Sequence, residues 1–157
     1  MTGVENAGAN SYVLLQVGRQ RFALSADIVA ELAPPVRLHT IPHTSPLVSG
    51  VIVRRGHIVP VYDAAPVLGV KSSFSHRFYL IARRDFEGAT ELSAIPVNGE
   101  CELATGEVLP PRDDRPDCVT GTLTIGEEVL DVLDFEKLLA SRPAQANTSA
   151  TPAEARS

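Results

Sequence analysis

The stretch "GVIVRRGHIVPVYD" (residues 50–63) decides the fold of this chain. Two short apolar runs flank the basic tetrapeptide at 54–57, so the stretch predicts a β-hairpin with a basic tip. Asp63 then precedes "AAPVLG", where its side chain can cap a short helix that Gly69 ends. The segment therefore predicts two strands, a turn and a helix in quick succession.

The same pattern returns later in the chain. Residues 48–69 align with 119–140 without a gap, at a constant offset of 71 positions. The identities in the alignment are Val48/Val119, Gly50/Gly121, Val61/Val132, Asp63/Asp134 and Leu68/Leu139. Asp134 is accordingly expected to cap a helix over "FEKLLAS". We interpret the match as a structural repeat, which predicts an all-β body of two similar halves, each curled into a small barrel because closure removes exposed strand edges.

The rest of the chain contains further β-type segments separated by turn residues. Strands are predicted at 12–17, 21–24, 78–84, 91–97 and 100–109, with turns at 18–20, 87–90 and 98–99. Asn98-Gly99 is the strongest turn dipeptide in the chain. The segment "PPRDDRPD" (110–117) is expected to be a surface loop, since its prolines and acidic residues suit neither helix nor strand.

A helix is also predicted after the first two strands. Ser25 can cap it, and Asp27 is favourable near the positive end of its dipole. Ile28, Val29 and Leu32 form an apolar stripe, and the proline pair at 34–35 stops the pattern.

Composition limits the classes of function. The net charge of -5 argues against a nucleic-acid partner, because binding to phosphates needs clustered positive charge. No apolar run approaches the roughly 20 residues of a membrane span, so direct membrane insertion is not expected. Residues 1–10 lack signal-peptide features, which favours the cytoplasm. Residues 1–10 and 143–157 are expected to be disordered tails around a folded unit at 11–142.

Residues with catalytic or metal-binding chemistry are few and poorly arranged. Cys101 and Cys118 are expected to stay reduced and cannot form a zinc site alone. His39 and His43 are four apart, but the proline between them excludes the helix that would bring them together. The sequence has no nucleophile elbow, phosphate loop or dinucleotide fingerprint. We therefore expect no catalytic residue, no metal and no cofactor, and interpret the repeated aspartates as caps, not an acid–base pair.

Several segments in order resemble the CheW-type domain, the adaptor of bacterial chemosensory arrays. They are "YVLLQVGRQRFAL", "VAEL" at 29–32, "IP" at 41–42 with Pro46, the opening stretch, and "VTGTLTIGEEVLDVLDFEKLL". The resemblance covers about residues 12 to 140. It implies two five-stranded, SH3-like barrels packed together, with a few short helices, in a non-enzymatic signalling scaffold.

The resemblance also implies partners. Such proteins link a CheA-type histidine kinase to the cytoplasmic tips of methyl-accepting receptors, and so are recruited to membrane-associated arrays. Val29, Glu31, Gly50 and Arg55 match positions at which family members contact receptor helices. A solvated turn residue is the alternative for Arg55. A backbone requirement is the alternative for Gly50, and it is favoured because the repeat has a second glycine at the same place.

Two departures from the family pattern leave the pathway open. The family usually has Asn-Leu before its Arg-Gly, where this chain has Val53-Arg54, and Val-Asp where it has Val97-Asn98. Arg54 replaces an apolar family residue, and solvation of its side chain is the alternative to contact. The changes allow an adaptor for type IV pilus motility or another chemosensory pathway, or a binder of a different regulator outside arrays. A small β-barrel enzyme or ligand binder would instead need a pocket with converging polar groups.

Overall fold

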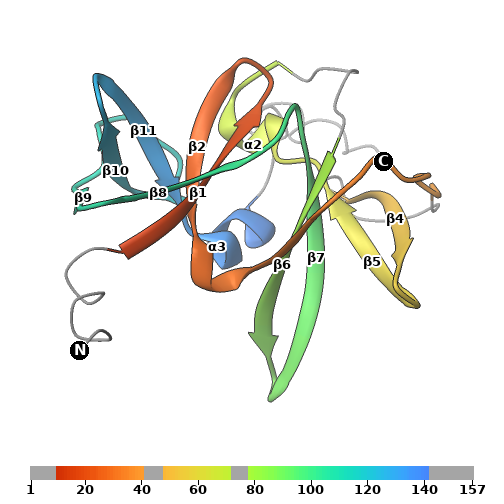
Figure 1. Cartoon of the computed structure of the whole chain (residues 1–157). Coiled ribbons are helices and arrows are strands. Elements are labelled where there is room, and N and C mark those ends of the chain that lie inside the picture. The colour runs from red at the N-terminus through yellow and green to blue at the C-terminus, as the bar shows by residue number, and fades with distance from the viewer. Residues whose placement is uncertain (1–9, 41–47, 72–77, 142–157) are drawn as a thin grey trace, which may run out of the picture.

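The computed structural model describes residues 10–40, 48–71 and 78–141, which form two β-sheets and short helices (Figure 1). The six-stranded sheet has the order β8-β1-β2-β11-β10-β9 and the five-stranded sheet the order β3-β6-β7-β5-β4. The strands of the first are β1 (Asn10–Val17), β2 (Gln20–Ser25), β8 (Glu102–Gly106), β9 (Val108–Leu109), β10 (Val119–Ile125) and β11 (Glu128–Leu133). Those of the second are β3 (Val29–Ala33), β4 (Val48–Arg54), β5 (His57–Tyr62), β6 (Phe78–Phe86) and β7 (Ala89–Val97). The all-β prediction is confirmed.

The chain passes twice between the two sheets. In Figure 1 the red and orange strands β1 and β2 lie beside the blue β11, although they come from opposite ends of the sequence. The chain enters the five-stranded sheet at β3 and returns to the six-stranded sheet at β8. The strands of the six-stranded sheet are therefore connected through the five-stranded sheet. The β1–β2 hairpin completes a sheet whose other strands come from the second half of the chain.

Strand register shows that the two halves are a structural repeat. The β4–β5 and β10–β11 ladders have the same pairing 71 positions apart, and both have a bulge just before their glycine. The equivalent pairs are Val48↔Tyr62 and Val119↔Leu133, Gly50↔Val61 and Gly121↔Val132, and Ile52↔Val59 and Leu123↔Leu130. Beyond these ladders, Val61 pairs in parallel with Ala94 and Val132 with Ala23, again 71 positions apart. The repeat therefore extends into β2 and β7.

Both sheets close on themselves. In the five-stranded sheet, His39 follows β3 and exchanges two backbone hydrogen bonds of 2.8 Å with Val51 of β4, at the far end of the strand order. In the six-stranded sheet β9, which follows β8, pairs with β10 in the equivalent place. The closing segments leave few strand edges open, as expected for small barrels.

The core has three layers. One apolar cluster fills each barrel, and a third lies between the barrels together with α2 (Ala65–Leu68) and α3 (Phe135–Ala140). In β1, Tyr12 and Leu14 point into the barrel while Val13 and Leu15 belong to the middle layer. Both faces of this strand are buried, which explains its continuous apolar run.

The helix predicted after Ser25 is wrong beyond its first turn. Ser25 Oγ accepts a hydrogen bond from Asp27 N at 3.4 Å, but the following element is a 3-10 turn, η1 (Ala26–Ile28). From Val29 onward the chain is strand β3, in which Leu32 pairs with Leu80 of β6. Val29 is β-branched and favours a strand, and the β6 ladder satisfies backbone groups that a short isolated helix would expose.

The two repeated aspartates act differently at their helices. Asp134 Oδ1 accepts a hydrogen bond from Lys137 N at 3.0 Å and caps α3. Asp63 is displaced from the predicted cap, because the N-cap of α2 is Ala64, and Asp63 Oδ1 accepts instead from Ala65 N at 3.2 Å. It stabilises the turn that enters the helix. Gly69 ends α2 with a φ of 71°, as predicted.

The segment around 98–109 also differs from expectation. Asn98-Gly99 forms no hairpin, because β7 and β8 lie in different sheets and the dipeptide marks the crossing. The Asn98 side chain accepts a hydrogen bond from Gly18 N at 2.7 Å and so ties the crossing to the first hairpin. The strand predicted at 100–109 is divided into β8 and β9.

The loop at 110–117 is a surface segment, as predicted, and it is held by a buried carboxylate. Asp131 of β11 is 5% exposed and pairs with Arg112 at 2.8 Å and Arg115 at 3.1 Å. Asn10, expected in the N-terminal tail, is the first residue of β1. The rest of the expected tails, 1–9 and 143–157, lies outside the described residues, as do His43 and Pro46.

Candidate interaction site

The tip of the β4–β5 hairpin is a tight two-residue turn. Arg55 and Gly56 occupy it with φ values of 53° and 81°. The left-handed conformation costs a residue with a Cβ atom about 1 kcal/mol, so asparagine or glycine would suit the position better than arginine. Glu87 has the same backbone, with φ of 52°, in the β6–β7 turn. The strain is therefore a requirement of the hairpin, and its effect here is to place the Arg55 side chain outward, 71% exposed.

Glu31 forms an ion-pair cluster with this tip. Its Oε2 accepts from Arg54 Nε at 2.7 Å and lies 2.6 Å from Arg54 Nη2, while its Oε1 accepts from Arg55 Nε at 3.3 Å. The Arg54 hydrogen bond is the main cause that lowers the pKa of Glu31, against a smaller opposing effect of burial. We call these three residues the Glu31 cluster.

The cluster joins the two ends of the five-stranded sheet. Glu31 lies on β3 and Arg54 on β4, the first and last strands in the sheet order. Barrel closure thus brings together Glu31 and Arg55, which the sequence placed in separate segments. Arg54 is not the solvated side chain that was one alternative, because it is 25% exposed and makes the shortest contacts to Glu31. Sequence reasoning missed this pairing, since it depends on the curvature of the whole sheet.

The other two predicted contact residues are less accessible. Val29 is half-buried at the start of β3 and packs against the core between the barrels. Gly50 is buried at the β4 bulge, and a Cβ atom there would collide with the backbone of His39 and Thr40. Position 50 therefore requires glycine because the closing segment approaches β4 closely there. Gly121 is the equivalent residue of the second barrel, where an added Cβ atom would meet Val108 and Leu109.

An exposed apolar pair lies next to Arg54 and His57 in the β4–β5 ladder. Val53 and Ile58 face each other across the β4–β5 ladder and are 53% and 71% exposed. We call this pair the apolar platform, and the pair and the Glu31 cluster together the hairpin-tip surface, since all five residues lie at or near the β4–β5 tip. In the second barrel the exposed large apolar side chains are Leu103, Leu109 and Val129.

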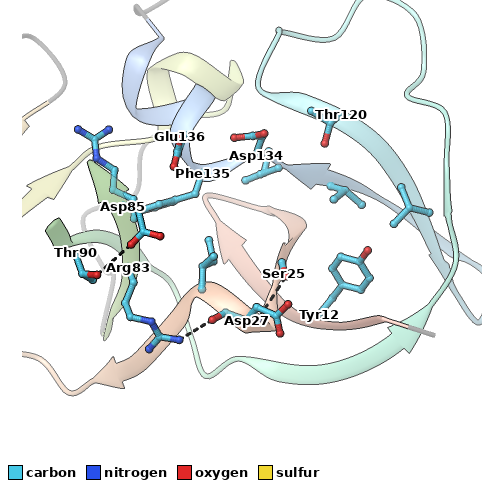
Figure 2. Close-up of a pocket in the computed structure, with 15 residues that line it drawn as sticks. Tyr12, Ser25, Asp27, Arg83, Asp85, Thr90, Thr120, Asp134, Phe135 and Glu136 are labelled. Atoms are coloured by element: carbon cyan, nitrogen blue, oxygen red, sulfur yellow. Dashed lines mark hydrogen bonds between the residues drawn. The ribbon is translucent and has the colours of Figure 1, made fainter. Parts of the chain in front are cut away.

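A separate cleft of about 610 Å³ lies between the barrels (Figure 2). Arg83 Nη2 donates to the Asp27 carbonyl oxygen at 2.6 Å, and Thr90 Oγ1 donates to Asp85 Oδ1 at 3.0 Å. Among the described residues that line the cleft there is no histidine, cysteine or lysine. Ser25, at the η1 cap, and Asp134, at the α3 cap, also line the cleft and bond to the backbone of the fold.

The remaining titratable groups concern metal binding and thiol reactivity. Within 10–40, 48–71 and 78–141, no three histidine, cysteine or carboxylate side chains gather to hold a metal ion. Burial raises the pKa of both Cys101 and Cys118 to about 11, so both thiols are protonated at neutral pH. No helix in these segments has the length and apolar character needed to cross a membrane.

Comparison with known proteins agrees with this architecture. A family model described as a CheW-like domain matches residues 11–143. A protein of Rhizobium etli described as a probable chemotaxis protein CheW is 21% identical over 146 residues, covering 90% of this chain and 94% of the relative. The crystal structure of the scaffolding protein TtCheW from Thermoanaerobacter tengcongensis superposes with a TM-score of 0.70 at 20% identity, over 82% of this chain and 86% of that one. The likeness in structure supports the two-barrel fold.

Proposed function

Because this chain belongs to the CheW-like domain family, whose members are scaffolds and not enzymes, we propose that it couples methyl-accepting chemoreceptors to a CheA-type histidine kinase. It does so in the cytoplasm, where receptor arrays at the membrane recruit it. Its mechanism is geometric: two fixed surfaces hold receptor and kinase together, so that a change in the receptor shifts the population of kinase conformations.

The hairpin-tip surface is the observation that carries the receptor half of this proposal. Glu31 and Arg55 form an ion pair there, and Val53 and Ile58 of the same hairpin are exposed. An amphipathic helix needs a matching apolar strip with polar groups at its border, and this surface offers both. Arginine also suits interfaces, since its stem buries apolar area while its guanidinium directs several hydrogen bonds.

The kinase half rests on the second barrel. Leu103, Leu109 and Val129 are 75%, 50% and 44% exposed, and among the described residues the other large apolar side chains with such exposure are Val53 and Ile58 of the first barrel. Exposed apolar residues on a rigid sheet favour contact with another protein. In a scaffold, a surface on each barrel allows both partners to bind at once.

Binding measurements with single substitutions test the receptor contact. The ligand is the cytoplasmic-tip fragment of a methyl-accepting receptor from the same organism, titrated calorimetrically into the full chain. Arg55→Ala should weaken binding about fivefold or more, as expected for a charged interface contact. Arg19→Ala is the matched control, because Arg19 is an exposed arginine in the β1–β2 turn of the other sheet. Equal losses in both variants, or none in either, would count against the assigned surface.

The Glu31 cluster also favours a second candidate, an adaptor of another chemosensory pathway such as type IV pilus motility. Arg54 stands where the resemblance expects an apolar residue, and it makes the main contact to Glu31. A changed contact surface fits a changed receptor. Titrating receptor tips from each chemosensory system of the organism would distinguish the pathways, because only the cognate tip should bind with Arg55-dependent affinity.

A further inference from the structure

The two arginines of the Glu31 cluster share the carboxylate unequally. Arg54 approaches one oxygen with two nitrogens, at 2.6 and 2.7 Å, and is mostly buried. Arg55 reaches the other oxygen with Nε alone, at 3.3 Å, and remains 71% exposed. Among the described residues, Nε is the Arg55 nitrogen that donates to Glu31, and the exposed guanidinium has further N–H donors that could bind a partner.

We propose that Arg54 is a positioning residue that occupies Glu31 and so leaves Arg55 available to bind a carboxylate on the partner helix. The inference rests on the proposed receptor-binding function and names the chemistry of the partner: a helix with an aspartate or glutamate beside an apolar stripe. With one cation the cluster would be a neutral, self-satisfied pair. With two it has a net charge of one positive, in a chain whose overall charge is -5.

The second barrel shows that the scaffold does not require this arginine. Ile125 takes the place of Arg54 in the β10–β11 hairpin, 71 positions later, and packs against the core of its barrel. Glu102 takes the place of Glu31 at the sheet end and pairs with Arg21 of β2 instead. An apolar residue at the tip is therefore compatible with a closed barrel, and the charge at position 54 serves something other than closure.

The apolar platform fixes how a partner helix would lie. The Val53↔Ile58 pair is separated from the turn residues by the Arg54↔His57 pair alone, so a helix that covers it passes within two ladder positions of Arg55. A carboxylate at that border gains a charge-assisted hydrogen bond, while a lysine there would meet like charge. The surface thus discriminates between acidic and basic tips.

A rescue experiment tests the proposal with four proteins: wild type, Arg54→Leu, Glu31→Gln and the double variant. The probe is the receptor-tip fragment used above, and a second probe has its exposed tip carboxylates changed to amides. Arg54→Leu should weaken binding of the first probe about fivefold, because Arg55 then closes onto Glu31. The double variant should return to within about twofold of wild type, because Arg55 is released again. The amide probe should bind all four proteins alike.

Other outcomes overturn the inference. A double variant as weak as Arg54→Leu alone would make Arg54 a direct contact or a folding residue, and thermal melting of each variant separates these two. Unchanged binding in Arg54→Leu would remove Arg54 from recognition. A partner-free measurement keeps the inference distinct from the function: NMR titration should show that the pKa of Glu31 stays below its usual value in Arg54→Leu, because Arg55 closes onto the carboxylate. If wild type binds the kinase and receptor but this pattern is missing, the inference alone fails; if wild type binds neither, the proposed function fails with it.

Discussion

Gly50→Ala tests the closure of the first barrel. The added Cβ atom would collide with the carbonyl oxygen of His39 and lie 3.0 Å from its carbonyl carbon and 3.1 Å from Thr40 Cα. All three are backbone atoms of the closing segment, so a rotamer change cannot relieve the contact. The segment must move away from β4, which strains the two 2.8 Å hydrogen bonds between His39 and Val51.

The magnitude follows from these contacts. Overpacking typically costs about 1–3 kcal/mol, and each weakened backbone hydrogen bond about 0.5–1.5 kcal/mol. We expect a loss of about 2–4 kcal/mol in the free energy of unfolding, which lowers the melting temperature by roughly 10 °C for a domain of this size. Urea denaturation and scanning calorimetry measure both quantities.

Two further glycines act as comparison and control. Gly121→Ala should cost a similar amount, because its Cβ atom would meet Val108 and the Leu109 carbonyl oxygen in the second barrel. Gly99→Ala should change stability by less than about 0.5 kcal/mol, since nothing lies within 4 Å of its added Cβ atom. If the melting temperature of Gly50→Ala is close to that of Gly99→Ala and not to that of Gly121→Ala, the reasoning from barrel closure is refuted.

Four other predictions concern stability and reactivity. Asp134→Ala should cost about 1 kcal/mol in urea unfolding through loss of the α3 cap, and an unchanged midpoint would contradict the capping role. Asp131→Asn should destabilise by about 1–3 kcal/mol and expose the 110–117 loop to limited proteolysis. Because the pKa of Glu31 is lowered in the folded state, its contribution is present above the unfolded pKa of about 4.3 and lost as pH falls below it. Wild type should therefore lose slightly more stability than Glu31→Gln between about pH 5 and 3, by less than about 1 kcal/mol because the pair is partly solvated. Cys118 should resist alkylation at pH 8 until urea unfolds the chain, since it is fully buried and its pKa is raised to about 11.

Much of the fold is visible in the sequence because the repeat has a local pattern. The alignment of 48–69 with 119–140 predicts two matching hairpins, and their registers agree down to the bulge before Gly50 and Gly121. Hairpins and short helices depend on neighbours in sequence, so apolar runs, glycines and capping residues suffice to locate them. The confirmed elements are of this kind.

The incorrect predictions concern segments whose structure is determined by pairing with strands that are distant in the sequence. Ile28, Val29 and Leu32 have helical spacing, yet β6 supplies a ladder from Val29 onward, and residues 29–33 become β3. Asn98-Gly99 has hairpin chemistry, yet the chain crosses there to the other sheet because β1 offers the partner for β8. In both cases tertiary pairing overrides a local preference.

The candidate site was predicted in part. Glu31 and Arg55 were named from the family resemblance, and the structure brings them together. The pairing of Arg54 with Glu31 was missed, because it spans the two ends of a curled sheet and no local pattern encodes that approach. The contact roles of Val29, Glu31, Gly50 and Arg55 remain predictions.

The central claim is that this protein joins a receptor to a kinase, and co-sedimentation measures that directly. Membranes containing a methyl-accepting receptor of the same organism are incubated with its CheA-type kinase, with and without the full chain, and the kinase in the pellet is quantified. The account predicts that the kinase sediments with the membranes only when the chain is present, and that Arg55→Ala reduces the amount. Equal sedimentation of the kinase with and without the chain, in the presence of receptor, would contradict it.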